Sequence, residues 1–133
     1  MYTGHVVNIG NTRKIHAIRS QCPKLAAMLS HDLFLHHVFF WLKEPENPEN
    51  HALLLDGIRT LGKIPSIRSF HIGVHAGTTR DVIETTYSFS WLAIFGSPEA
   101  QDDYQVDPIH LRFVEEYGHL WDRVLIYDSV GAY

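Results

Sequence analysis

Cysteine, positive charge and long hydrophobic runs are all scarce in this sequence. The single cysteine, Cys22, cannot form an internal disulfide, and no CxxC pair is present to bind zinc through thiolates. Acidic residues outnumber basic ones by 15 to 11, and no basic cluster occurs, so a nucleic-acid partner is not expected. The longest apolar run, residues 33–42, is about half as long as a membrane-crossing helix. These absences predict a protein of a reducing compartment that binds neither nucleic acid nor membrane.

A secretory signal is also missing from the first residues, which have no charged start followed by an apolar block. We therefore expect a cytoplasmic protein. What the chain does have is apolar and aromatic content, 45% and 12% of its 133 residues. This is enough for the core of one domain and leaves little for a second.

Strand and helix patterns alternate along the chain after residue 32. Residues 33–43 form an apolar run typical of a strand. Asn47 and Pro48 are start signals of a helix that follows, and Gly62 is its stop signal. Further segments are predicted as strands over 67–76, 87–96 and 123–130 and as helices over 97–105 and 108–120. The order β-α-β-β-α-β predicts an α+β, ferredoxin-like fold, with a four-stranded antiparallel sheet and helices on one face.

An internal similarity supports this division into two halves. The segment 39–49, FFWLKEPENPE, aligns with 89–99, FSWLAIFGSPE, at five of eleven positions. In both, a strand leads into a helix that begins with Pro and Glu, as the two halves of a split β-α-β fold would.

Both faces of the predicted sheet are apolar. In the first strand Phe34, Val38 and Phe40 lie on one side, and Phe39 and Trp41 lie on the other. Helices on one face leave the second face uncovered, so we expect an obligate homodimer that packs these faces together. The alternative is a monomer whose aromatic residues are exposed or covered by the N-terminal segment.

Residues 1–31 lie outside the repeat and show no clear periodicity. We interpret them as an N-terminal extension, with disorder of at least part of it left open, and residues 32–133 as the domain.

Ten histidines are many for this length, and three of them need an explanation. His36 and His37 lie in the apolar first strand and must point to opposite faces, so only one of them can face the helices. His110 shares its helix face with Phe113, Val114, Tyr117 and Trp121, and therefore points inward. With Asp107 as the N-cap, His110 is the third helical residue, where the helix dipole favours a neutral imidazole suited to proton transfer. The structural alternatives are a capping role for His110 and a core imidazole for His36.

Metal binding is not expected. His71 and His75 share a strand face but are about 13 Å apart by strand rise, and no HExxH or tight histidine-carboxylate set occurs.

The order of HHVFFWLK, GKIPSIRSFHIG, YSFSWLAIFGSPEAQDDYQVDPIHLRFVEEY and VLIYDSV resembles the stress-responsive dimeric α/β-barrel (Dabb) family over about residues 33–130. The resemblance implies a ferredoxin-like fold and a face-to-face dimer. One plant branch of that family is a cofactor-independent polyketide cyclase that performs an aldol step. Its strand histidine corresponds to His36, or to His37 if the strand is shifted by one, its helix histidine to His110 and its pocket tyrosine to Tyr104. Asp107 departs from this pattern, because the cyclase has a histidine there.

Two functions follow as hypotheses. In the first, a small carbonyl or aromatic compound lies between sheet and helices, where His36 and His110 transfer protons as catalytic residues without a cofactor. Tyr104, Phe113 and Tyr117 would then contact the substrate. In the second, the chain is a non-catalytic dimeric stress or binding domain with structural histidines. A haem- or oxygen-using relative is a third and weaker possibility. Without a cavity of roughly 300 Å³ or more around these side chains, the first hypothesis fails and the second is favoured.

Overall fold

The computed structural model describes residues 32–132, and the predicted extension over residues 1–31 lies outside them. The described elements are β1 (Phe34–Leu42), α3 (Pro48–Leu61), β2 (Ser69–Gly73), β3 (Phe89–Phe95), α4 (Pro98–Val106), α5 (Pro108–Tyr117), the short 3₁₀ helix η1 (Gly118–Leu120) and β4 (Trp121–Val130). Of the helices in this part of the chain, none has the length and apolarity that crossing a membrane requires.

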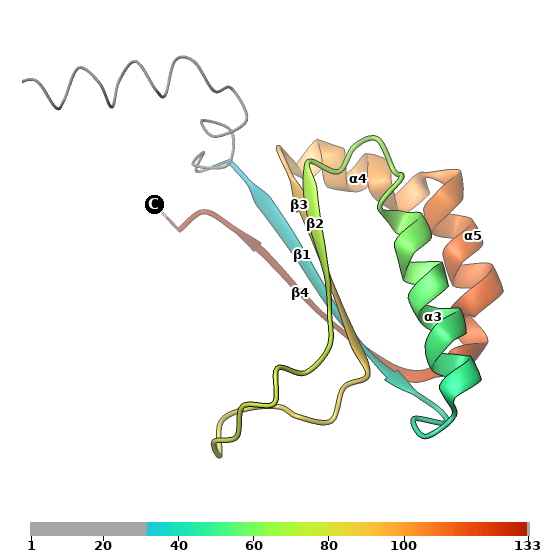
Figure 1. The fold of residues 1–133 in the computed structure, drawn as a ribbon. Helices are drawn as coiled ribbons and strands as arrows, with labels where there is room; N and C mark the ends of the chain where they lie inside the picture. The colour runs from blue at the N-terminus through green and yellow to red at the C-terminus, as the bar shows by residue number, and fades with distance from the viewer. Residues whose placement is uncertain (1–31, 133) are drawn as a thin grey trace, which may run out of the picture. The chain divides into compact units, whose positions relative to one another are not determined.

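The four strands form one antiparallel sheet in the order β2-β3-β1-β4. Helices α3, α4 and α5 all lie on the same side of this sheet (Figure 1). The sequence-based prediction of a ferredoxin-like α+β fold is therefore confirmed. Because β1 is central and pairs with both β3 and β4, those of its side chains that face the helices lie in the middle of the layer between sheet and helices.

Each helix begins where the sequence places a capping residue followed by proline. The side chain of Asn47 accepts hydrogen bonds from the backbone N–H groups of residues 49 and 50, Ser97 caps α4, and Asp107 caps α5. Asp107 thus ends α4 and starts α5 at the same residue, which turns the chain sharply beside the sheet.

The core fills the space between the sheet and the helices. Alternate residues of β1 are buried there, as are alternate residues of β3 and one face of α3. Its buried members from these three elements are Val38, Phe40, Leu42, Phe89, Trp91, Ala93, Phe95, Leu54, Ile58 and Leu61. The strand faces therefore follow the alternation that the sequence predicted.

The last helix is shorter than predicted. We expected it to run to Leu120, but α5 ends at Tyr117 and β4 begins at Trp121, two residues before the predicted start at Arg123. The residues between them, Gly118–Leu120, form a 3₁₀ turn. Trp121 therefore packs against the core as the first residue of a strand. Val114, predicted to face the sheet, is 48% exposed and lies at the edge of the layer.

Strand β2 is also shorter than the predicted 67–76. Its last pair joins Gly73 to Ser90, and because β3 begins at Phe89, the residues after Gly73 have almost no strand left to pair with. They continue into the long loop over 74–88 instead (Figure 1).

No described helix covers the second face of the sheet (Figure 1). That face carries aromatic and aliphatic side chains, among them Phe39, Leu92 and Tyr127. The ring of Phe39 lies at the centre of this face, 4.3 Å from the ring of His37, 5.0 Å from that of Tyr87 and 6.2 Å from that of Tyr127. Burial among these groups, together with the neighbouring His71 and His36, lowers the pKa of His37.

Candidate functional site

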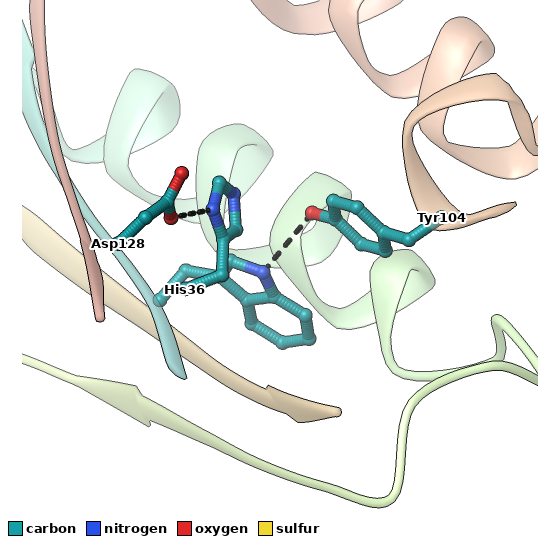
Figure 2. A network of polar contacts seen from close by, with 4 residues as sticks. His36, Tyr104 and Asp128 are labelled. Carbon is teal, nitrogen blue, oxygen red and sulfur yellow. Dashed lines mark hydrogen bonds and ion pairs between the residues drawn. The ribbon is translucent and has the colours of Figure 1, made fainter. Parts of the chain in front are cut away.

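His36 points from the middle of β1 into the layer between sheet and helices. It is 3% exposed, whereas His37 lies on the opposite face of the sheet. His36 is therefore the histidine that faces the helices, a point that the sequence left open. Directly across on β4, Asp128 is its register partner, and Asp128 Oδ1 lies 2.6 Å from His36 Nδ1 (Figure 2). A carboxylate accepts hydrogen bonds, so the proton sits on Nδ1 and the Nε2 edge of the ring is turned away from Asp128.

Tyr104 approaches the same space from α4. Its side chain is buried, its ring centroid lies 5.5 Å from that of His36, and its hydroxyl accepts a hydrogen bond of 3.1 Å from Trp91 Nε1 (Figure 2). Burial raises the pKa of Tyr104 far above its ordinary value, so the phenol keeps its proton. Within residues 32–132 this bond is the one that the hydroxyl makes, and its own O–H remains available to donate.

His110 completes the group from the first turn of α5. Its Nδ1 lies 3.0 Å from the carbonyl oxygen of Gln105, and its ring centroid lies 4.7 Å from that of Tyr104. Because a carbonyl can only accept, Nδ1 carries the hydrogen and Nε2 keeps the lone pair of the neutral ring. Burial is the main cause that lowers the pKa of His110, with a smaller contribution from His36, while Gln105 and Asp107 act in the opposite direction. The neutral imidazole expected from the helix dipole is thus favoured chiefly by burial.

These side chains line a cavity of about 210 Å³. The lining is mostly apolar and consists of His36, Val38, Phe40, Leu61, Trp91, Tyr104, Gln105, His110, Phe113, Val114, Trp121, Val124 and Ile126. The volume falls short of the roughly 300 Å³ that we set, so the expectation of a pocket of ordinary small-molecule size is wrong. The volume exceeds the roughly 150 Å³ of an engineered apolar cavity that holds benzene, so the space suits a compound with about one ring.

Four of the five predicted site residues meet at this cavity: His36, His110, Tyr104 and Phe113. Tyr117 does not. Its ring packs against Gly57 of α3, where a Cβ atom would lie 2.7 Å from the ring carbons, and it lines a separate hollow of about 170 Å³ between α3 and α5. The two helices approach closely here, and the Tyr117 ring lies in their contact.

Two polar residues of the site, Asp128 and Trp91, were not predicted from the sequence. Alternation in the last strand carried a signal for Asp128, because it shares a face with Val124 and Ile126 and is the one acid on that apolar side. No sequence signal indicated that the Nε1–H of Trp91 would meet the hydroxyl of Tyr104.

Metal ligands do not gather in this region. Across residues 32–132 no three His, Cys, Asp or Glu side chains are placed to hold an ion together.

Comparison with known proteins gives a family and a fold. Residues 34–130 match the family described as the stress responsive A/B barrel domain, Dabb. No curated protein matches the chain.

Solved structures share this fold at low sequence identity. A Dabb family protein from Mesorhizobium loti has 23% identity and a TM-score of 0.62, and the match covers 74% of this chain and 95% of that one. A dimeric ferredoxin-like protein of unknown function from Thermobifida fusca has 15% identity and a TM-score of 0.62, with 74% and 90% covered. A hydroxynitrile lyase from Passiflora edulis has 15% identity and a TM-score of 0.62, with 76% and 94% covered. At these identities the likeness is one of fold.

Proposed function

Because the chain belongs to the stress responsive A/B barrel (Dabb) domain family, whose fold holds both an enzyme and proteins of unknown function, we propose that it performs acid-base chemistry on a small carbonyl compound. The reaction would be of the aldol, cyclisation or isomerisation type. The compound lies between the sheet and the helices, and the chemistry uses side chains alone.

The observation that carries this proposal is the set of three polar groups at one small cavity. Tyr104 offers a hydroxyl donor, while His36 and His110 are each held through Nδ1 so that Nε2 is free to accept a proton. The rest of the lining is almost entirely apolar, which strengthens the interactions of these few polar groups with a ligand.

These groups have complementary roles. Tyr104 donates a hydrogen bond to the carbonyl oxygen of the substrate, and an imidazole Nε2 removes a proton from the adjacent carbon. The electrons of the broken C–H bond form the enolate, whose oxygen is stabilised by Tyr104. The enolate then either regains the proton at another position or attacks a second carbonyl group. Asp128 accepts the Nδ1 hydrogen of His36 throughout and fixes the orientation of its ring.

Relatives support an active cavity without identifying the substrate. The Passiflora edulis protein of this fold is a hydroxynitrile lyase, so the fold can carry lyase chemistry. The sequence of this chain also contains the histidine pair and tyrosine that the resemblance to the cyclase branch implies.

Exchange of carbon-bound hydrogen tests the proposal. The methyl protons of acetophenone should exchange with D₂O faster in the presence of the protein, by about 10²–10⁴-fold over a variant that lacks the acting base. His110→Gln and His36→Gln should lower the rate, whereas His119→Gln, which removes an exposed histidine outside the cavity lining, should leave it unchanged. Exchange by the unmodified protein no faster than by the His36 and His110 variants would refute the proposal.

We propose further that the chain is a homodimer packed through the uncovered face of its sheet. The support is the apolar character of that face, with Leu35, Phe39, Trp41, Leu92 and Ile94 only half-buried in one chain, and the description of fold relatives as dimeric. Light scattering after gel filtration tests it, and the mass of a single chain at micromolar concentration would contradict it.

A second candidate function is a non-catalytic binding or structural domain. The observation that favours it is the cavity volume of about 210 Å³, which lies below the usual range of small-molecule pockets. In that case the cavity would bind compounds without turnover, and the exchange measurement would show no acceleration.

A further inference from the structure

The part of the cavity lining that the structure describes carries no fixed positive charge. None of the thirteen residues that line it is a lysine or an arginine. Of its polar side chains, Tyr104 and Gln105 are neutral, which leaves the two histidines as the groups that could attract an anion.

Neither histidine supplies that attraction. Burial lowers the pKa of His110, so its ring is neutral near pH 7. His36 is joined to Asp128 at 2.6 Å, and the pair is neutral when the ring is protonated and negative when it is not. An anionic ligand in the cavity would therefore lose its hydration and meet a carboxylate behind His36 without any compensating cation.

We infer that the site selects uncharged, single-ring or similarly short carbonyl compounds and rejects carboxylates and phosphates of the same size. This inference rests on the proposed function, because it describes the substrate class of the same cavity. The upper limit on size comes from the volume, and the preference for a carbonyl or hydroxyl group comes from the single free O–H of Tyr104.

Benzamide and benzoate are suitable probes, because they have nearly the same shape and differ in charge. Calorimetric titration of the full chain near pH 7 should show benzamide binding and benzoate binding at least about 100-fold more weakly.

Adding a cation to the lining provides the converse test. Val114 on α5 and Ile126 on β4 both line the cavity and are each 48% exposed, so lysine can replace either without burying a charge in the core. Val114→Lys and Ile126→Lys should each strengthen benzoate binding by about tenfold or more. Leu111→Lys is the matched control, because Leu111 lies on the same helix, is 56% exposed and is not part of the lining.

The outcomes separate the two proposals. If benzamide binds and benzoate binds only after Val114→Lys or Ile126→Lys, the charge selectivity is supported. If both probes bind the unmodified protein within a few-fold of each other, the selectivity is refuted while the ligand-binding cavity stands. If benzoate stays unbound in both lysine variants, the absence of a cation is not the cause and the inference falls. If neither probe binds up to its solubility limit, the proposed function falls with it.

Discussion

Removal of the Asp128 carboxylate should destabilise the protein, because its partner is buried. The side chain of His36 is 4% exposed, and without Asp128 its Nδ1–H would lose its acceptor within the described structure. A hydrogen bond to a charged group contributes about 1.5–3 kcal/mol, and a buried donor without a partner costs about 1–3 kcal/mol. Since the Asp128 side chain is itself 44% exposed, water can replace part of the interaction. We therefore expect Asp128→Ala to lower the free energy of unfolding by about 1–2 kcal/mol.

The conservative variant Asp128→Asn should lower the free energy of unfolding by a smaller amount. Asp128→Asn keeps an oxygen acceptor but loses the charge, and charge-assisted hydrogen bonds are about twice as strong as neutral ones. Asp128→Asn should therefore cost roughly half as much as Asp128→Ala. The measurement is urea unfolding at neutral pH, with the midpoint shift converted at constant m-value.

A double-mutant cycle isolates the interaction from side effects of each substitution. Combined with His36→Phe, the loss caused by Asp128→Ala should largely disappear. The Asp56–Arg59 pair is the control, because it spans a similar distance of 3.2 Å but both side chains are more than 60% exposed. Its coupling energy should not exceed about 0.5 kcal/mol. A coupling energy for His36 and Asp128 no larger than this control would refute the assignment of Asp128 as the partner that orients His36.

Three further outcomes are expected. The lowered pKa values of His37 and His110 mean that the unfolded chain binds more protons near pH 6, so the free energy of unfolding should be nearly constant between about pH 7.5 and 9 and fall as the pH is lowered through about 6.5, as urea titrations at several pH values can show. Gly57→Ala should destabilise the protein by about 1 kcal/mol, because the contact at 2.7 Å with Tyr117 outweighs a gain in helix propensity of about 1 kcal/mol, and the loss should shrink in a Tyr117→Ala background. Leu92→Asp, at the centre of the uncovered sheet face, should convert the dimer to monomers in light scattering while the circular dichroism spectrum stays unchanged.

Local signals were sufficient to predict the elements and their order. Asn47, Ser97 and Asp107 cap helices as the sequence indicated. The alternation in residues 34–42 correctly divided the side chains between two faces, but it did not show which face the helices bury. The predicted end of the last helix was wrong. Trp121 would point inward as part of the helix and also as part of the strand, so its apolar character could not show which element it belongs to.

A site residue could be predicted from the sequence only where the strand or helix that carries it determines the direction of its side chain. Strand alternation limited the first-strand choice to His36 or His37, and helix periodicity turned His110 inward. The partners of these rings come from distant parts of the chain: Asp128 is 92 residues from His36, and Trp91 is 13 residues from Tyr104. Such pairs depend on strand register and helix packing, which one sequence does not specify. Tyr117 shows the same limit, since its ring lies in the contact with α3 at Gly57 and not in the cavity lining.

The most direct test of the account is a crystal structure of the protein with acetophenone bound. The account predicts the phenyl ring among the apolar residues of the cavity, with the ketone oxygen within hydrogen-bonding distance of the Tyr104 hydroxyl and the methyl carbon beside an imidazole Nε2 of His36 or His110. A ligand bound elsewhere, or a space between these rings closed by repacked side chains, would contradict it.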